Sequence, residues 1–255
     1  MIKLKTPAEI EIMRQGGKIL ALVIDEVIKQ VKPGVSTQEI NDLAERLIKK
    51  YSAKPSFKGY KASWASYPFP SALCLSLNHE VVHGMPSKEK ILMEGDILGI
   101  DCGLEYRGYF TDMAKTVGVG KISRDTKKLL AVTEEALMQG IKQAKVGNKL
   151  SNISRAVQAT VEKNGFSVVR QLVGHGIGDK PHEDPQIPNY VDRNYEDIVL
   201  KKGMVLAIEP MVNVGDFLVE TLPDDWTIVT ADSSLSAHFE HTLAVTDKGG
   251  DILTI

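Results

Sequence analysis

The sequence has little cysteine, no long apolar run and no excess of either charge. Cys74 and Cys102 are its only cysteines, and they form no Cys-x-x-Cys pair, which excludes a zinc ribbon and argues against a disulfide scaffold. The longest uninterrupted apolar run covers residues 19–24, whereas a membrane-spanning helix needs about 20 residues. We therefore expect two small buried cysteines and a chain that does not cross a membrane.

Basic and acidic residues nearly balance, at 31 and 33, and the basic ones are scattered along the chain. This excludes the clustered basic face of a nucleic-acid-binding protein. The first residues lack the apolar stretch and cleavage site of a secretory signal, so we expect a cytoplasmic protein. The 255 residues can bury a sizeable core. Because no linker rich in Pro, Gly or Ser divides them, we expect a single domain over residues 1–255.

The sequence predicts four helices and a mixed set of strands. Capping boxes at residues 6–9 and 36–39 predict helices that end at Pro33-Gly34 and near Tyr51. Two further helices are predicted at residues 124–145 and 152–164, each followed by a glycine. Because no strict β-α-β repeat is present, we predict an α+β fold. The strand-like runs are residues 71–77, 97–102, 109–117, 168–173, 204–208, 227–230 and 241–245.

The chain contains a concealed duplication. Residues 95–101 align with residues 203–209, matching a glycine, an apolar strand, a small residue, an isoleucine and a final carboxylate. Each segment follows a His-Gly step and precedes a second acid that comes after an aromatic residue. These residues are His83 and Asp112 for the first segment and His175 and Glu240 for the second. We predict two related halves, about residues 1–122 and 123–255, whose acids meet between them.

Asp101 and Asp112 lie on adjacent predicted strands. If the hairpin is centred on Tyr106 and Arg107, the two acids face each other at about 4.5–5.5 Å. A three-residue loop with a bulge at Gly108 would instead turn them apart. Four carboxylates and a histidine suit a divalent cation, and such a set can bridge two ions about 3.5–4 Å apart. The residues alone therefore predict a dinuclear metallohydrolase without specifying its substrate.

Residues 174–182 contain three glycines and Pro181, which exclude a helix there. We expect a loop in which the glycines beside His175 let the backbone approach a ligand. His83, which also precedes a glycine, has the same character. For His79 and His238 we expect surface or packing positions.

Taken together, these residues resemble the type I methionine aminopeptidases. The resemblance implies their pita-bread fold, with two pseudo-twofold-related halves and a central antiparallel sheet flanked by helices. It also implies two divalent metal ions, which in this family are Co, Mn, Fe, Zn or Ni. The most specific stretches are residues 78–86, 174–178, 182–190, 209–210, 234–237 and 240–242.

The resemblance also implies roles for individual residues. The implied metal ligands are Asp101, Asp112, His175, Glu209 and Glu240, of which Asp112 and Glu240 bridge the two ions. Glu209 is implied as the general base, and His83 and His182 as groups that contact the substrate around the scissile bond. The implied walls of the methionine pocket are Tyr60, Phe69, Cys74 and Trp226, which the residues alone would indicate as core positions.

The implied activity is removal of the initiator methionine from chains with a small second residue, through a hydroxide shared by the two metals. The implied partners are the N-termini of nascent polypeptides near the ribosome, and we expect a monomer. One alternative is a proline-specific aminopeptidase of the same fold, although such relatives carry a large extra N-terminal domain. The other is a non-catalytic binding module, although such modules lose ligands and none is missing here.

The sequence departs from the family pattern near the implied pocket. Eight residues, 61–68, separate Phe57-Lys58-Gly59-Tyr60 from Phe69-Pro70-Ser71, where the family typically has about two. We predict a longer loop at the pocket mouth that carries Trp64.

Overall fold

Four α-helices occur among residues 2–255, the part of the chain that this computed structural model describes. Both predicted capping boxes form, because Thr6 and Ser36 accept the backbone N–H groups of Glu9 and Glu39 while the two glutamates accept those of the cap residues. All four predicted helices are confirmed, although the first ends before the predicted Pro33-Gly34. None of the described helices is both long enough and apolar enough to cross a bilayer. The helices are α1 (Pro7–Ile28), α2 (Thr37–Lys50), α3 (Arg124–Gln143) and α4 (Leu150–Lys163).

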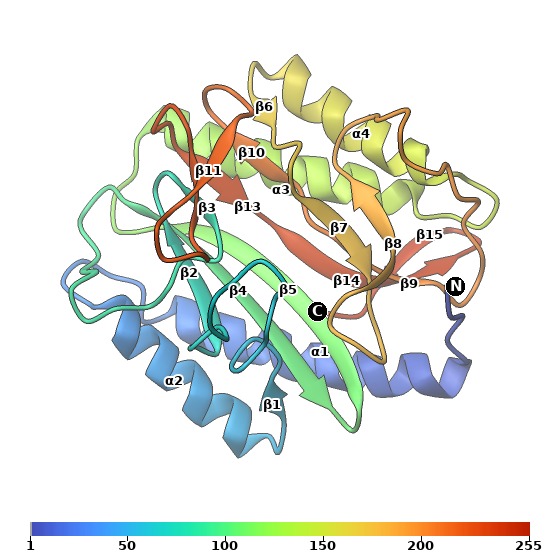
Figure 1. Ribbon diagram of the computed structural model, residues 1–255, viewed down its shortest axis with the longest axis horizontal. Coiled ribbons are helices and arrows are strands. Elements are labelled where there is room, and N and C mark those ends of the chain that lie inside the picture. The colour runs from blue at the N-terminus through green and yellow to red at the C-terminus, as the bar shows by residue number, and fades with distance from the viewer. Residues whose placement is uncertain (1) are drawn as a thin grey trace.

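A nine-stranded sheet forms the centre of the molecule (Figure 1), and its path runs β1-β4-β5-β14-β9-β7-β8, with β2 paired to β4 and β15 to β14. Its strands are β1 (Lys54–Pro55), β2 (Leu73–Leu77), β4 (Ile97–Tyr106), β5 (Tyr109–Gly118), β7 (Val173–Gly176), β8 (Glu183–Pro188), β9 (Val205–Ile208), β14 (Glu240–Thr246) and β15 (Gly249–Ile252). Two three-stranded sheets have the orders β13-β10-β6 and β11-β12-β3. Their strands are β3 (Glu80–Val82), β6 (Ser167–Val168), β10 (Met211–Asn213), β11 (Val219–Thr221), β12 (Ile228–Thr230) and β13 (Ser236–His238).

The two halves meet at a seam between β5 and β14. On one side of the seam β5 is followed by β4 and β2, and on the other β14 is followed by β9 and β7. Across it, Ala114 lies opposite Glu240 and Met113 opposite His241. The matched strand order, with all these pairs antiparallel, is that of the predicted α+β pita-bread fold.

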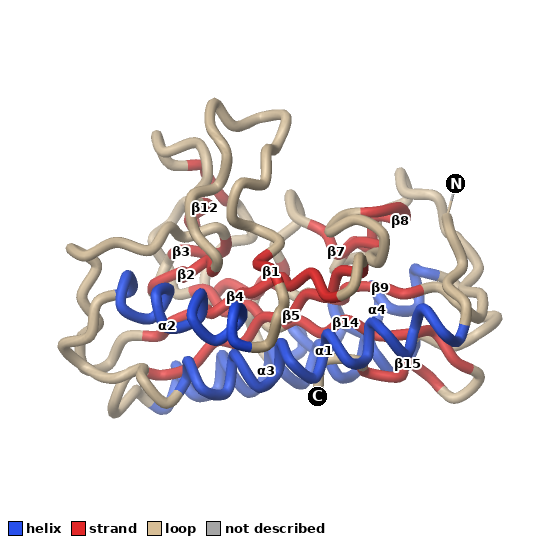
Figure 2. Tube along the Cα trace, turned by 90° about the horizontal axis from the view of Figure 1, so that it is seen from below, coloured by secondary structure: helices blue, strands red, loops and turns tan. Residues whose placement is uncertain are grey.

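The helices cover one face of the sheet and leave the other face to short strands and loops (Figure 2). Leucine, isoleucine and cysteine side chains of β4 alternate toward the helical layer, where they join the buried faces of α1 and α2. Asp101 interrupts this apolar strand from the opposite face. The sheet therefore separates an apolar layer from a face that can carry polar groups.

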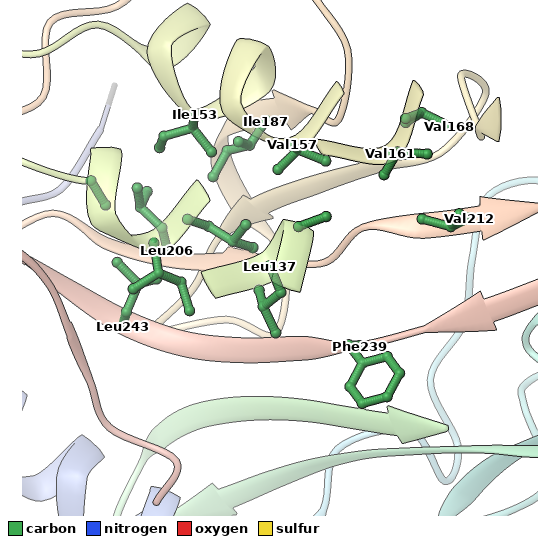
Figure 3. Packing of buried hydrophobic residues seen from close by; sticks show 14 of the residues in the cluster. Leu137, Ile153, Val157, Val161, Val168, Ile187, Leu206, Val212, Phe239 and Leu243 are labelled. Atoms are coloured by element: carbon green, nitrogen blue, oxygen red, sulfur yellow. The ribbon is translucent and has the colours of Figure 1, made fainter. Parts of the chain in front are cut away.

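The second half has an equivalent core. Ile153, Val157 and Val161 of α4 pack with Leu137 of α3 and with Leu206 of β9 (Figure 3). Each of these five side chains is at most 1 % exposed. Such burial contributes about 1.5–3 kcal/mol per large aliphatic side chain, so this layer fixes β9 and β14 firmly beneath the open face.

The structure corrects one predicted strand and one predicted match between the halves. Residues 168–173 are not one strand, because β6 ends at Val168 and β7 begins at Val173. His83 is not the counterpart of His175, since the strand beside β4 is β2, where Ser76 lies opposite Gly99, and His83 follows β3 in another sheet. The repeated His-Gly step was a sequence coincidence that strand pairing does not preserve.

Candidate active site

A cavity of about 750 Å³ lies on the side of the sheet that carries Asp101, opposite the helical layer. It is lined by all eleven residues for which the sequence predicted a role, together with residues of the loops above the sheet. The eleven are Asp101, Asp112, His175, Glu209, Glu240, His83, His182, Tyr60, Phe69, Cys74 and Trp226. The fold thus brings the eleven predicted site residues to one place.

The register of the β4–β5 hairpin differs from the prediction. Arg107 and Gly108 both have positive φ angles, 51° and 84°, and form a two-residue turn between Tyr106 and Tyr109. Asp112 therefore lies opposite Gly103, and Asp101 opposite Ala114. The predicted direct pairing of the two acids was wrong, and so was the alternative of a three-residue loop that would shift the register by one residue and turn the acids apart. The actual shift is two residues, so both acids stay on one face as diagonal neighbours.

Asp112 and Glu240 are placed by the seam itself. Thr242 Oγ1 donates to the Asp112 carbonyl oxygen and accepts the Asp112 N–H, both at 2.8 Å. The Asp112 and Glu240 side chains are 3 % and 2 % exposed. A carboxylate oxygen of each and a ring nitrogen of His175 all lie within 4.8 Å of one another. That spacing fits three ligands around a shared cation.

The carboxyl groups are held in an unfavourable electrostatic environment. Burial raises the pKa of Asp112, and burial together with repulsion from Asp112 raises the pKa of Asp101, Glu209 and Glu240. Asp101 Oδ1 and Glu240 Oε1 are buried without a hydrogen-bond partner. Because buried polar atoms are nearly always paired, these two oxygens fit a ligand role, and a divalent cation would offset the repulsion.

His175 lies on β7, between β8 and β9, rather than in the predicted loop. The flanking glycines serve strand packing, since a Cβ at Gly174 would lie 2.5 Å from the Ala207 carbonyl oxygen and one at Gly176 would lie 2.2 Å from that of Asp184. Nδ1 of His175 donates to the Gly176 carbonyl oxygen at 2.9 Å. Its Nε2 therefore carries the lone pair, and it lies 3.4 Å from Glu209 Oε1.

Two further histidines come from segments outside the central strands. His83 follows β3, whose pairing with β12 brings its ring to 6.2 Å from that of Trp226, between centroids. His182 precedes β8, with its ring centroid 4.4 Å from that of His175 and 5.2 Å from that of Tyr60. Burial, with the nearby His182, lowers the pKa of His83 to about 4, and burial lowers the pKa of His182. Both rings are neutral near pH 7.

The loop that carries His182 is held by the N-terminal segment. The Lys5 side chain is 1 % exposed, and its Nζ donates to Asp179 Oδ2 at 2.9 Å and to Glu183 Oε2 at 2.8 Å. Glu183 Oε1 also accepts the backbone N–H groups of Asp179 and Lys180. This network orders the turn just before β8, where His182 must be positioned.

One end of the cavity is apolar. Phe69, Cys74 and Trp226 are each at most 3 % exposed and form one cluster, against which Tyr60 packs. The Phe69 and Trp226 rings meet edge to face at 5.2 Å. Cys74 lies opposite Asp101 in the β2–β4 pair, so the apolar end adjoins the carboxylates directly.

The predicted loop at residues 61–68 lies at the mouth of this apolar end. Trp64 lines the cavity and has its ring centroid 6.2 Å from that of Trp226. The structure therefore confirms the predicted location of Trp64.

Sequence reasoning missed His238. The residue is 3 % exposed, and its Nε2 lies 3.7 Å from Glu209 Oε2 without a hydrogen-bond partner. Burial, with the nearby His83, lowers the pKa of His238 to about 3. Its place, at the end of β13 and two residues before Glu240, was the signal that could have identified it.

Comparisons with known proteins agree with this geometry. The profile of metallopeptidase family M24 matches residues 11–247. The chain is 54 % identical to methionine aminopeptidase 1 of Bacillus subtilis, over 100 % of this chain and 99 % of that protein. The crystal structure of methionine aminopeptidase from Thermotoga maritima superposes with a TM-score of 0.94 at 47 % identity, covering 100 % and 99 % of the two chains.

A more distant match separates this chain from the proline-specific enzymes. The Xaa-Pro dipeptidase of Bacillus anthracis is 23 % identical, has a TM-score of 0.77, and is covered over only 61 % of its length by 98 % of this chain. That likeness is one of fold alone. The chain therefore belongs to metallopeptidase family M24 and, within that family, to the methionine aminopeptidases.

Proposed function

We propose that this chain removes the initiator methionine from polypeptides whose second residue is small. The observation that carries the proposal is a single cavity in which four carboxylates and a histidine adjoin a closed apolar end. An unbranched, polarizable thioether suits an apolar slot edged by aromatic rings and a thiol. A peptide bond next to that side chain would lie over the carboxylates.

We propose that Asp101, Asp112, His175, Glu209 and Glu240 hold two divalent metal ions, with Asp112 and Glu240 shared between them. The mixture of carboxylate oxygens and one imidazole suits Co, Mn, Fe, Zn or Ni. Support comes from the unpartnered oxygens of Asp101 and Glu240 and from the His175 ring, whose Nδ1 donates to Gly176 and whose Nε2 lone pair faces the carboxylates. When bound, the metals supply Lewis acidity and lower the pKa of a water molecule.

The side chains around this centre would accept and donate protons and hydrogen bonds during hydrolysis. Burial and repulsion from Asp112 raise the pKa of Glu209, which strengthens its carboxylate as a proton acceptor, and we assign it the role of general base. His83 and His182 are neutral near pH 7, so each can donate one N–H to the developing oxyanion or the leaving amide. His238, close to Glu209, would orient that carboxylate.

The biological setting is part of the proposal. We place the activity in the cytoplasm, on the N-termini of nascent polypeptides near the ribosome. We further propose a monomer with one catalytic domain over residues 1–255, formed by halves of about residues 1–122 and 123–255.

Peptide hydrolysis tests the proposal. Protein reconstituted with each of the five metals is assayed on Met-Ala-Ser, Met-Leu-Ser and Ala-Pro peptides, with Glu209→Gln as a control of nearly equal size. We expect free methionine from Met-Ala-Ser alone, and none with the variant. Preference for Ala-Pro would assign a proline-specific enzyme, and no release from any peptide would assign a binding module. Calorimetric titration with Mn(II) should give two equivalents.

A further inference from the structure

The loop of residues 61–68 is fixed in place at the cavity mouth. Ser66 donates both its backbone N–H and its hydroxyl to Asp225 Oδ2. Tyr67 donates its hydroxyl to the Asp224 carbonyl oxygen at 2.8 Å, and Trp226 Nε1 donates to the Tyr67 carbonyl oxygen at 3.1 Å. Four hydrogen bonds thus tie the loop to the turn before β12, on the open side of the sheet (Figure 2).

This anchoring presents Trp64 to solvent at a fixed place. The Trp64 residue is 63 % exposed, whereas Trp226, the next ring inward, is 3 % exposed. The two rings pack edge to face at 6.2 Å with an interplanar angle of 63°. A scattered surface aromatic needs no explanation, but an exposed indole on the rim of a deep cavity offers apolar area to whatever enters.

The spacing of the two indoles matches that of alternate residues in an extended peptide. Such residues project to the same side and lie about 6.4–6.8 Å apart. Trp226 is a wall of the apolar end, which in the proposed function takes the first side chain. Trp64 lies 6.2 Å from Trp226 and is far more exposed to solvent. In an extended peptide whose first side chain contacts Trp226, the third side chain would project toward Trp64. The second side chain projects the opposite way.

We infer that Trp64 forms a subsite for the third residue of the peptide and favours an apolar or aromatic side chain there. This inference rests on the proposed function, because that function sets the direction of the bound peptide. The subsite acts on both the ground state and the transition state, so it lowers KM and leaves kcat unchanged. It leaves selectivity for the second residue unaltered.

The test compares Met-Ala-Phe with Met-Ala-Ser as substrates of the metal-reconstituted protein. We expect the wild type to have a kcat/KM about three- to tenfold higher for Met-Ala-Phe, the effect of one aromatic contact. Trp64→Ala should abolish this preference by raising KM for Met-Ala-Phe alone. Trp64→Phe should retain part of it. Ser63→Ala is the matched control, since Ser63 is exposed on the same loop but does not line the cavity.

The outcomes separate the two proposals. If the wild type releases methionine from both peptides with equal kcat/KM, or if Trp64→Ala keeps the preference, the subsite is refuted and the proposed function stands. If Trp64→Ala slows both peptides equally, Trp64 is a structural part of the mouth and the subsite is again refuted. If the wild type releases no methionine from either peptide, both proposals fail.

Discussion

Each half of the sheet carries two acids at matching positions, but the halves differ in the strand beside them. In the first half, β4 and β5 form one hairpin with a two-residue turn, and β2 contributes Ser76 and the pocket residue Cys74. In the second half, β9 and β14 lie far apart in the chain, and β7 contributes His175. The carboxylates lie on or directly after the shared strands, and the neighbouring strand carries the proposed pocket residue Cys74 on one side and the proposed nitrogen ligand His175 on the other.

The strongest test of this comparison substitutes one seam acid from each half. Asp112→Asn and Glu240→Gln should each lower methionine release by more than about a hundredfold, since even groups that only support metal ligands are worth about 10–100-fold. Metal content, measured with kcat/KM, should fall in both variants. Met113→Leu is the control, because Met113 belongs to the helix-side core. A strong loss of methionine release in only one of the two variants would mean that the two halves do not contribute equally to metal binding and catalysis.

Substitutions on β7 and on β2, the strands that differ between the halves, should have unequal effects on metal affinity and activity. His175→Ala should lower metal affinity and activity at least about tenfold. Ser76→Ala should leave activity within about twofold, because Ser76 Oγ only accepts the Gly84 N–H at 3.2 Å. That variant should lose about 0.5–1.5 kcal/mol of unfolding free energy. Urea denaturation measures the loss of stability, and kinetics measure the change in activity. Altered metal affinity in Ser76→Ala would contradict the view that Ser76 takes no part in metal binding.

Metal removal should destabilise the seam in a pH-dependent way. Burial raises the folded-state pKa of the four carboxyls above their unfolded values, so the metal-free folded state binds more protons than the unfolded one. The stability of chelator-treated protein should therefore fall as the pH rises from about 4 through neutrality. Metal-free Asp112→Asn should melt above metal-free wild type at pH 8 and close to it at pH 4. Calorimetry at both pH values checks this, and a pH-independent difference would contradict it.

The smallest expected effect concerns the helices of the first half, which alone begin with Glu-containing capping boxes among the described helices. Hydrogen bonds from Thr6 lower the pKa of Glu9 to about 2. Glu9→Ala should reduce the free energy of unfolding by about 1 kcal/mol near neutral pH. Because the folded pKa is depressed, this difference is full above about 4.5 and disappears as the pH falls to about 2. Chemical denaturation across that range measures it, with Glu11→Ala as the exposed control.

Local signals predicted most of the fold. The capping boxes and C-terminal glycines located all four helices, and alternating apolar residues located most of the strands. Strand pairing was not predictable in the same way. The β4–β5 register depended on whether Arg107 adopts a left-handed conformation, which is uncommon for a residue other than glycine.

Site residues could be predicted only where their immediate sequence neighbours marked them. The acids at the ends of apolar strands could be identified from the residues, whereas the pocket residues Tyr60, Phe69, Cys74 and Trp226 followed only from the family resemblance. His238 escaped notice because its importance depends on its 3.7 Å approach to Glu209, a residue 29 positions away in the sequence. The glycines around His175 suggested a loop, although close contact with β8 and β9 was the reason for them.

The seam between β5 and β14 has a consequence for how the enzyme could be divided. A chain cut between Ile122 and Ser123 would leave Asp101 and Asp112 on one fragment and His175, Glu209 and Glu240 on the other. If these five residues form the proposed centre, neither fragment could assemble it alone, and both would be needed. Methionine release by the mixture would then report complementation between the fragments. Added metal, bound by ligands from both fragments, would strengthen their association.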